Sequence, residues 1–229
     1  MDNGNQSVKE FLTKNYFSFC LYAFILLGLL PLLLMPKQDI NLLVNEHIAN
    51  YFLDPFFIRY SQVFEGWCVV VIAIALVFVS KRKLLMFVVA GLLCCGITML
   101  LKDVIIGNMP RPTKFLPLDS FSHILEDVSI YEKQYSFPSG HSTLAFSLMA
   151  LFSSFSHRKV WCVCFFFVAL FAAFSRIYLL QHFFVDVYAG ACIGTAISVF
   201  VLFLFNRLIH ISDSPLVNFR GNKHHENEK

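Results

Sequence analysis

Charged residues are scarce in this 229-residue chain, where they make up 14% of the sequence; a typical soluble domain has about 25%. Apolar residues make up 57%, and the mean hydropathy is +0.66. A soluble fold of this length could not cover so much apolar surface, which favours an all-α polytopic membrane protein in contact with the bilayer. The net charge of +3 comes from short, scattered basic groups, which argues against a nucleic-acid partner.

The sequence also lacks the patterns of a metal or redox site. Its seven cysteines all lie in apolar stretches, and none forms a Cys-x2-Cys pair or has the Cys/His spacing of a zinc site. The carboxylates do not cluster either. We therefore expect no metal and no cofactor, and we interpret the cysteines as small core residues.

Apolar runs dominate the chain and predict six transmembrane helices. They cover residues 17–35, 55–80, 84–101, 139–155, 160–180 and 186–207. Asp54-Pro55 is a typical helix start, with Asp54 as the cap of the second span. Helical spacing over residues 40–52 predicts a further helix at the membrane interface, with Asn41 and Asn45 opposite its apolar positions.

This pattern divides the chain into three parts. Residues 1–15 form a polar N-terminal segment, residues 16–208 form the six-span domain, and residues 209–229 form a polar tail. Within the domain, residues 102–138 make the one long polar loop. Connections of this length are usually functional or disordered, so we expect the loop to belong to the active site.

Basic residues indicate the orientation of the six spans. Most of the eighteen Lys and Arg residues fall on the face of the termini and of two tight turns, residues 81–83 and 157–159. By the positive-inside rule this face is cytoplasmic, in a cell (inner) membrane. The long loop then faces the periplasm or the exterior. Lys37 is among the few basic residues on that outer side.

Two groups of polar residues stand at the outer ends of the third and fourth spans, where an unpartnered charge is costly. Lys102 and Arg111-Pro112 follow the third span, and they could be basic residues that extend to the interface. Pro138-Ser139-Gly140-His141 precedes the fourth span, and it could be a plain helix start. Alternatively, a Ser139 cap, the bare backbone of Gly140 and the positive helix end would favour an anion.

The third group is Ser175-Arg176, followed by His182 and Asp186. The last two are four positions apart, so on a helix they share a face and can form a hydrogen bond. An Asp that holds one imidazole nitrogen leaves the other nitrogen to attack or to accept a proton; a structural His–Asp pair at the helix end is the alternative. Arg176 stands in an apolar run, and its planar guanidinium matches a phosphate.

Together these groups point to phosphoryl transfer without a metal. Three cations, a helix N-terminus and two histidines meet on one face, and positioning and charge stabilisation are the main work in such catalysis. One histidine would be the nucleophile and the other a general acid. His182 has an Asp partner that supports a nucleophile, whereas His141 has none.

At this point the motifs resemble the type 2 phosphatidic acid phosphatase superfamily, whose pattern is Lys-x6-Arg-Pro, Pro-Ser-Gly-His and Ser-Arg-x5-His-x3-Asp. The second and third motifs stand here without a mismatch, at residues 138–141 and 175–186. The first motif departs from the pattern, because eight residues instead of six separate Lys102 from Arg111. Two extra residues must therefore loop out if both cations are to meet one phosphate.

The resemblance implies a role for each motif residue. His182 would attack phosphorus, Asp186 would orient His182, and His141 would protonate the leaving oxygen. The phosphoryl oxygens would be held by five further groups, namely Lys102, Arg111, Ser139, Gly140 and Arg176. His123 and His157 match no motif, and we interpret them as solvated surface residues.

The expected substrate is a phosphorylated lipid at the outer leaflet. A lipid A phosphate or undecaprenyl pyrophosphate is favoured, because acidic and tyrosine side chains of the long loop could bind a sugar headgroup; phosphatidylglycerol phosphate and phosphatidic acid are the other candidates. Two alternatives stay open. The same chemistry would serve a lipid-to-lipid phosphotransferase, and the same fold could be a transporter or a binding protein without catalysis.

Overall fold

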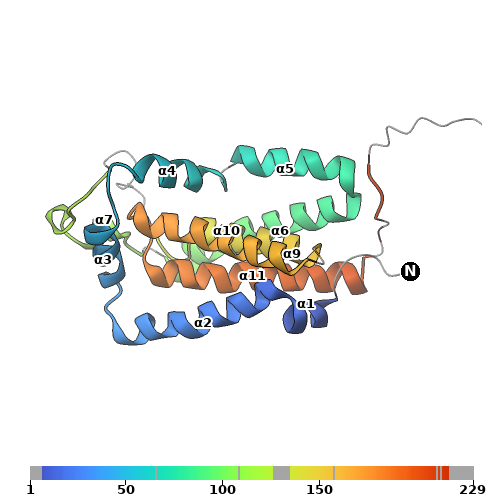
Figure 1. The fold of residues 1–229 in the computed structure, drawn as a ribbon, viewed down its shortest axis with the longest axis horizontal. Coiled ribbons are helices and arrows are strands. Elements are labelled where there is room, and N and C mark those ends of the chain that lie inside the picture. Colours follow the sequence, from blue (N-terminus) through green and yellow to red (C-terminus); the bar gives the residue numbers. More distant parts are fainter. Residues whose placement is uncertain are drawn as a thin grey trace, which may run out of the picture.

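The computed structural model describes residues 7–216 except 65, 108, 126–134, 157, 210 and 212. Every regular element in the described part is a helix, which agrees with the all-α expectation. The longer helices run side by side as a bundle, and α3 lies across one end of it (Figure 1). The elements are α1 (Val8–Lys14), α2 (Tyr16–Leu34), α3 (Asp39–His47), α4 (Asp54–Gln62), α5 (Gly66–Val79), α6 (Lys81–Leu100), the π-helix η1 (Leu101–Ile106), α7 (Pro112–Phe115), the 3-10 helix η2 (Leu118–Ser120), α9 (Gly140–Ser154), α10 (Lys159–Tyr178) and α11 (Phe184–Arg207).

Within the described residues, four helical segments are long and apolar enough to cross a membrane, which does not confirm the six spans that the sequence predicts. They are α2, the continuous stretch α6–η1, α10 and α11. The predicted second span, residues 55–80, consists of two separate helices, α4 and α5. The predicted fourth span is α9, which has only 15 residues.

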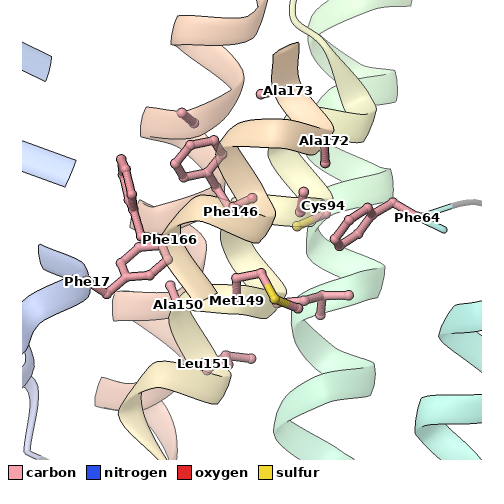
Figure 2. Close-up of a cluster of buried hydrophobic side chains, with 14 of the residues drawn as sticks. Phe17, Phe64, Cys94, Phe146, Met149, Ala150, Leu151, Phe166, Ala172 and Ala173 are labelled. Atoms are coloured by element: carbon pink, nitrogen blue, oxygen red, sulfur yellow. The ribbon is translucent and has the colours of Figure 1, made fainter. Parts of the chain in front are cut away.

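Helix α9 can be short because protein surrounds it. Eleven of its residues are buried, and it packs against α6, α10 and α11. Its Phe146 forms a ring cluster with Phe17 of α2 and Phe166 of α10, with centroids 5.7–6.3 Å apart (Figure 2). This cluster fixes the centre of the bundle and leaves the outer faces of α2 and α10 to lipid.

Two glycines let α9 and α11 approach closely. A Cβ on Gly190 would lie 2.8 Å from the carbonyl oxygen of Ser139, and one on Gly194 would lie 2.1 Å from that of Thr143. Small residues at four-residue spacing allow such contacts between helices in membranes. This close contact between α9 and α11, the seam, continues at Ser198, whose hydroxyl donates to the Ser147 carbonyl at 2.5 Å. It places the start of α9 directly against the start of α11.

The end of the bundle that holds the chain's first helix also holds many of the basic residues. The start of α2, the junction of α5 and α6 and the end of α11 all lie there, whereas α3 and α7 lie at the opposite end (Figure 1). Residues 81–83, expected in a tight turn, instead form the first turn of α6, which Ser80 caps. Arg82 is buried, and it donates to the Phe205 carbonyl and the Asn206 side chain.

The prediction that the cysteines are core residues is only partly right. Cys94 and Cys162 are buried, but Cys95 and Cys164 are exposed on the outer surface of their helices, where lipid can cover a thiol as well as protein can. Six of the seven cysteines have described side chains, and all six are free thiols.

Candidate active site

His182 and Asp186 meet at the start of α11, and a serine joins them. The His182 Nδ1 atom lies 3.4 Å from Asp186 Oδ2. The Ser136 hydroxyl donates to the same carboxylate oxygen at 2.5 Å and lies 3.4 Å from Nδ1. All three residues are buried. With Nδ1 turned toward the carboxylate, Nε2 is the ring nitrogen that can react.

The backbone around this pair is held from several sides. Asp186 Oδ2 also accepts the Phe183 N–H at 2.9 Å, as expected for a carboxylate in the first turn of a helix. The fully buried Asn41 of α3 donates to the His182 carbonyl at 3.0 Å. Leu180 has a φ of 55°, a left-handed conformation that turns the chain sharply between α10 and α11.

Helix α3 therefore turns polar side chains toward the protein. Asn41 and Asn45 are both buried, whereas Leu43 and Ile48 are exposed. The helix lies across the bundle end, as a helix at the interface would (Figure 1). Asn41 and Asn45 donate to the carbonyls of His182 and His123. Its observed bounds, Asp39–His47, are shorter than the predicted 40–52.

The Pro-Ser-Gly-His segment begins α9 beside the pair. Ser139 is the N-cap and accepts from the Ser142 N–H at 3.4 Å, and its own N–H donates to the Asp186 carbonyl at 3.0 Å. A Cβ on Gly140 would meet only Thr98 Oγ1, at 4.0 Å, so protein does not fill the space beside this backbone. His141 follows on the first turn and interacts electrostatically with His182.

Three cations, Arg111, Arg176 and Lys102, lie near His182. Arg111 is buried and donates from Nη1 to the Gln181 carbonyl at 2.9 Å, next to His182. Arg176 is buried at the end of α10, where it donates to the Ser61 hydroxyl of α4. Lys102 interacts electrostatically with Arg111, Arg176 and Asp186. The structure thus brings together the three groups that the sequence places far apart.

The π-helix η1 offers a place for the two extra residues between Lys102 and Arg111. Lys102 lies on η1, the wider turn that follows α6, and a π-helical turn holds more residues than an α-helical one. Gly107 then has a φ of 73°, a conformation that glycine adopts readily. Lys102 and Arg111 still interact electrostatically, so the long spacer does not separate the two cations.

Burial lowers the pKa of His182 well below its usual range, and Arg111, Arg176, Lys102 and His141 lower it further. Each cation disfavours a second positive charge on the ring. The free site therefore keeps His182 neutral at physiological pH, with an unprotonated nitrogen. An anion such as phosphate would be attracted to the same positive surroundings.

His123 corrects one expectation from the sequence. It is not a solvated surface residue, because its Nε2 lies 2.9 Å from Asp54 Oδ2 and its side chain is 11% exposed. Tyr178 donates to the same carboxylate at 2.8 Å. Asp54 stands at the start of α4 as expected, but Leu53 occupies the N-cap position and no side-chain hydrogen bond caps this helix.

His157 lies outside the described residues, as do Glu126, Asp127, Tyr131 and Glu132 of the loop.

Sequence reasoning missed three residues of the site, namely Ser61, Asn41 and Ser136. Ser136 and Asn41 hold Asp186 and the His182 backbone, and Ser61 holds Arg176. Ser61 and Asn41 are polar residues within helical apolar patterns, a feature of the sequence that could have identified them.

Among the described residues, no group of three or more His, Cys, Asp or Glu side chains is placed to hold a metal ion.

Comparison with known proteins agrees with this class of site. A model of the PAP2 superfamily matches residues 82–209, more than half of the chain. The chain belongs to the PAP2 superfamily, and the described histidine, aspartate and cation cluster lies almost entirely within the matched region.

Two individual proteins are similar to it. The crystal structure of Aquifex aeolicus LpxE matches with a TM-score of 0.60 and 27% identity, over 72% of this chain and 94% of that one. A PA-phosphatase related-family protein of Dictyostelium discoideum is 33% identical over 110 residues, which is 42% of this chain. The match spans 41% of the length of that relative.

Proposed function

We propose that this protein is a membrane lipid phosphatase that removes phosphate from a lipid at the outer leaflet through a phosphohistidine intermediate. The observation that carries the proposal is the buried His182–Asp186 pair surrounded by Lys102, Arg111 and Arg176. Membership of the PAP2 superfamily and the LpxE-like fold support the phosphatase class.

In the first step, Nε2 of neutral His182 attacks phosphorus and the bond from phosphorus to the leaving oxygen breaks. Asp186 accepts the Nδ1 proton in a hydrogen bond and stabilises the positive charge that grows on the ring. His141, on the first turn of α9, gives a proton to the leaving oxygen. The lipid alcohol or lipid phosphate then departs.

In the second step, water attacks the phosphohistidine and His141 takes up a proton from that water. Inorganic phosphate leaves, and both histidines return to their starting states. Throughout, the three cations, the Ser139 hydroxyl and the Gly140 N–H stabilise the charge on the phosphoryl oxygens. The open space beside Gly140 gives an oxygen room to approach the backbone.

The reaction needs no metal, because the cations take the part that a divalent ion has elsewhere. A chelator should therefore leave the rate of phosphate release unchanged, and strong inhibition that added metal reverses would contradict this mechanism.

Vanadate, which resembles the trigonal phosphorus of the transition state, should inhibit phosphate release. An unaffected rate would contradict the proposed phosphate-binding site.

Candidate substrates share a phosphate beside a hydrocarbon anchor. Undecaprenyl pyrophosphate and a lipid A phosphate are favoured, ahead of phosphatidylglycerol phosphate and phosphatidic acid. The protein would act in a cell (inner) membrane with its termini in the cytoplasm, by the positive-inside rule. The start of α11, which carries Asp186, lies at the end of the bundle opposite α1 (Figure 1). This orientation faces the site toward the periplasm or the exterior.

The test is phosphate release from each of these lipids by the wild type and by His182→Ala. We expect release by the wild type from at least one lipid and none above background by the variant. Equal release by both would contradict the proposal. Phosphate found on a second lipid instead of in solution would identify a phosphotransferase, and wild-type binding without turnover would favour a transporter or a binding protein.

A further inference from the structure

A cavity of about 390 Å³ adjoins the catalytic pair on the side of α2. Its lining includes Ser136, Asp186 and Phe183 from the site, Ile106 and Met109 from the segment after α6, and Lys37 from the turn after α2. Ser136 and Asp186 are already bound to each other. Among the described residues that line this cavity, Lys37 is the one with a positive charge.

A second cavity of about 290 Å³ shares Lys37 and Val185 with the first one. Its other lining residues include Pro31 and Leu32, at the end of α2. Helix α2 is a candidate membrane span, and its neighbouring Leu33 is 78% exposed, as expected for a lipid-facing residue. The two cavities thus both border Lys37, one beside Asp186 and the other beside the end of α2.

Aromatic rings hold the Lys37 ammonium group at this junction. Its Nζ lies 3.7 Å from the centre of the Phe115 ring and 4.8 Å from that of Phe183. A cation over a ring face is attracted to it but keeps its full charge. The lysine is also exposed, and it lines both cavities. The site therefore presents a fixed positive charge beside both cavities.

We propose that Lys37 binds the second phosphate of a lipid diphosphate, which makes it a residue that determines substrate specificity. This inference rests on the proposed function. The terminal phosphate would bind to the three cations around His182, and the second phosphate would bind to Lys37. The hydrocarbon chain of the lipid would lie in the second cavity, beside α2. A lipid monophosphate has no anion to place beside Lys37.

The lysine would also assist the first step with such a substrate. When His182 attacks the terminal phosphorus, the bond to the bridging oxygen breaks and that oxygen stays with the lipid as a monophosphate. The negative charge on the departing phosphate increases as this happens, and the ammonium group would stabilise it. His141 would supply the proton to the bridging oxygen.

The experiment measures kcat/KM for a prenyl diphosphate and for the matching prenyl monophosphate in the same detergent. The proteins are the wild type, Lys37→Met, Lys37→Arg and, as a control, Lys114→Met. Lys114 is an exposed lysine on α7 that does not line either cavity. Methionine keeps the length and apolar stem of lysine, so the Lys37→Met change removes little more than the charge.

For Lys37→Met, we expect the ratio of diphosphate to monophosphate kcat/KM to fall by about 10- to 100-fold, the range for a lost hydrogen bond to a charged group. Lys37→Arg should restore most of the ratio, and Lys114→Met should match the wild type on both substrates. An unchanged ratio in Lys37→Met would overturn the inference, whether both activities fall together or neither falls. If the wild type hydrolyses neither prenyl lipid, the inference fails; the proposed function fails only if the wild type also releases no phosphate from the other candidate lipids.

Discussion

Helices α11 and α2 both can cross a membrane, but protein covers them to different extents. Half of the most apolar window of α11 is buried, against 22% of that of α2. Helix α11 packs against α9 through glycines and serines and carries Asp186, whereas α2 faces lipid and leads to Lys37. Under the proposed function, the chemistry belongs to the buried helix pair and the choice of lipid to the exposed periphery.

The largest loss of activity is expected from a substitution of Asp186, on the buried helix α11. In Asp186→Asn the amide can donate to His182 Nδ1 instead of accepting from it, so the reactive nitrogen is left protonated. We expect kcat to fall by about 10³- to 10⁴-fold, as for the wrong tautomer in other His–Asp pairs. The measurement is steady-state phosphate release, with thermal unfolding in detergent as the control for folding. A loss of less than tenfold would remove Asp186 from the mechanism.

The cations around His182 are tested by Lys102→Met, which should lower kcat/KM by about 10²- to 10³-fold. Lys102 is one of the groups that lower the pKa of His182. Without this cation that pKa rises, so the acid limb of the residual kcat/KM profile should move to higher pH. The wild-type limb should lie below the ordinary His range, about 6.5. A shift to lower pH would contradict the placement of Lys102 beside His182.

The seam between α9 and α11 is tested by Gly194→Ala. The added Cβ would lie 2.1 Å from the Thr143 carbonyl oxygen, so the two helices must separate and His141 must move relative to Asp186. We expect activity to fall by about 10²-fold and the free energy of unfolding by about 1–3 kcal/mol.

The matched control is Gly91→Ala on α6, where an added Cβ meets nothing within 4 Å. It should unfold and react like the wild type. Equal effects of the two substitutions, by differential scanning fluorimetry and phosphate release, would show that the seam has no special role.

Ser136→Ala should give the smallest of these effects, a decrease in kcat of about 10-fold with little change in KM. The carboxylate of Asp186 would lose one donor but keep the Phe183 N–H. Ser136→Thr keeps the hydroxyl and should recover most of the rate. Ser120→Ala, at an exposed serine on η2, is the control. A change in KM alone would show that Ser136 affects binding and does not position Asp186.

The motif residues could be predicted from the sequence because each motif is local. His182 and Asp186 are one helical turn apart, and Ser139 caps the helix that follows it, so short spacing alone relates them. Residues that support the motifs across the bundle could not be found in this way. Ser136 meets Asp186, and Asn41 meets His182, only because α9 packs against α11 and α3 against α10.

The expectations that the structure corrects also involve contacts between distant segments. Asp54 and His123 each have an ordinary local explanation, as a cap and as a surface residue, but they bind each other across 69 positions. Residues 55–80 have the composition of one span, yet two helices form there, and Ser61 of the first one turns to Arg176. Hydropathy counts apolar residues, and it cannot register a polar side chain whose partner lies on another helix.

The central claim is that His182 carries the phosphoryl group between two steps. The direct measurement is mass spectrometry of the enzyme after a rapid acid-free quench during turnover, on the wild type and on His141→Ala. We expect one phosphoryl group on the peptide that contains His182 in the wild type and none in His182→Ala. Both steps use His141, so in His141→Ala the phosphoryl group should form and decay more slowly. The absence of phosphate on His182 during turnover, both in a fully active wild type and in His141→Ala, would contradict the account.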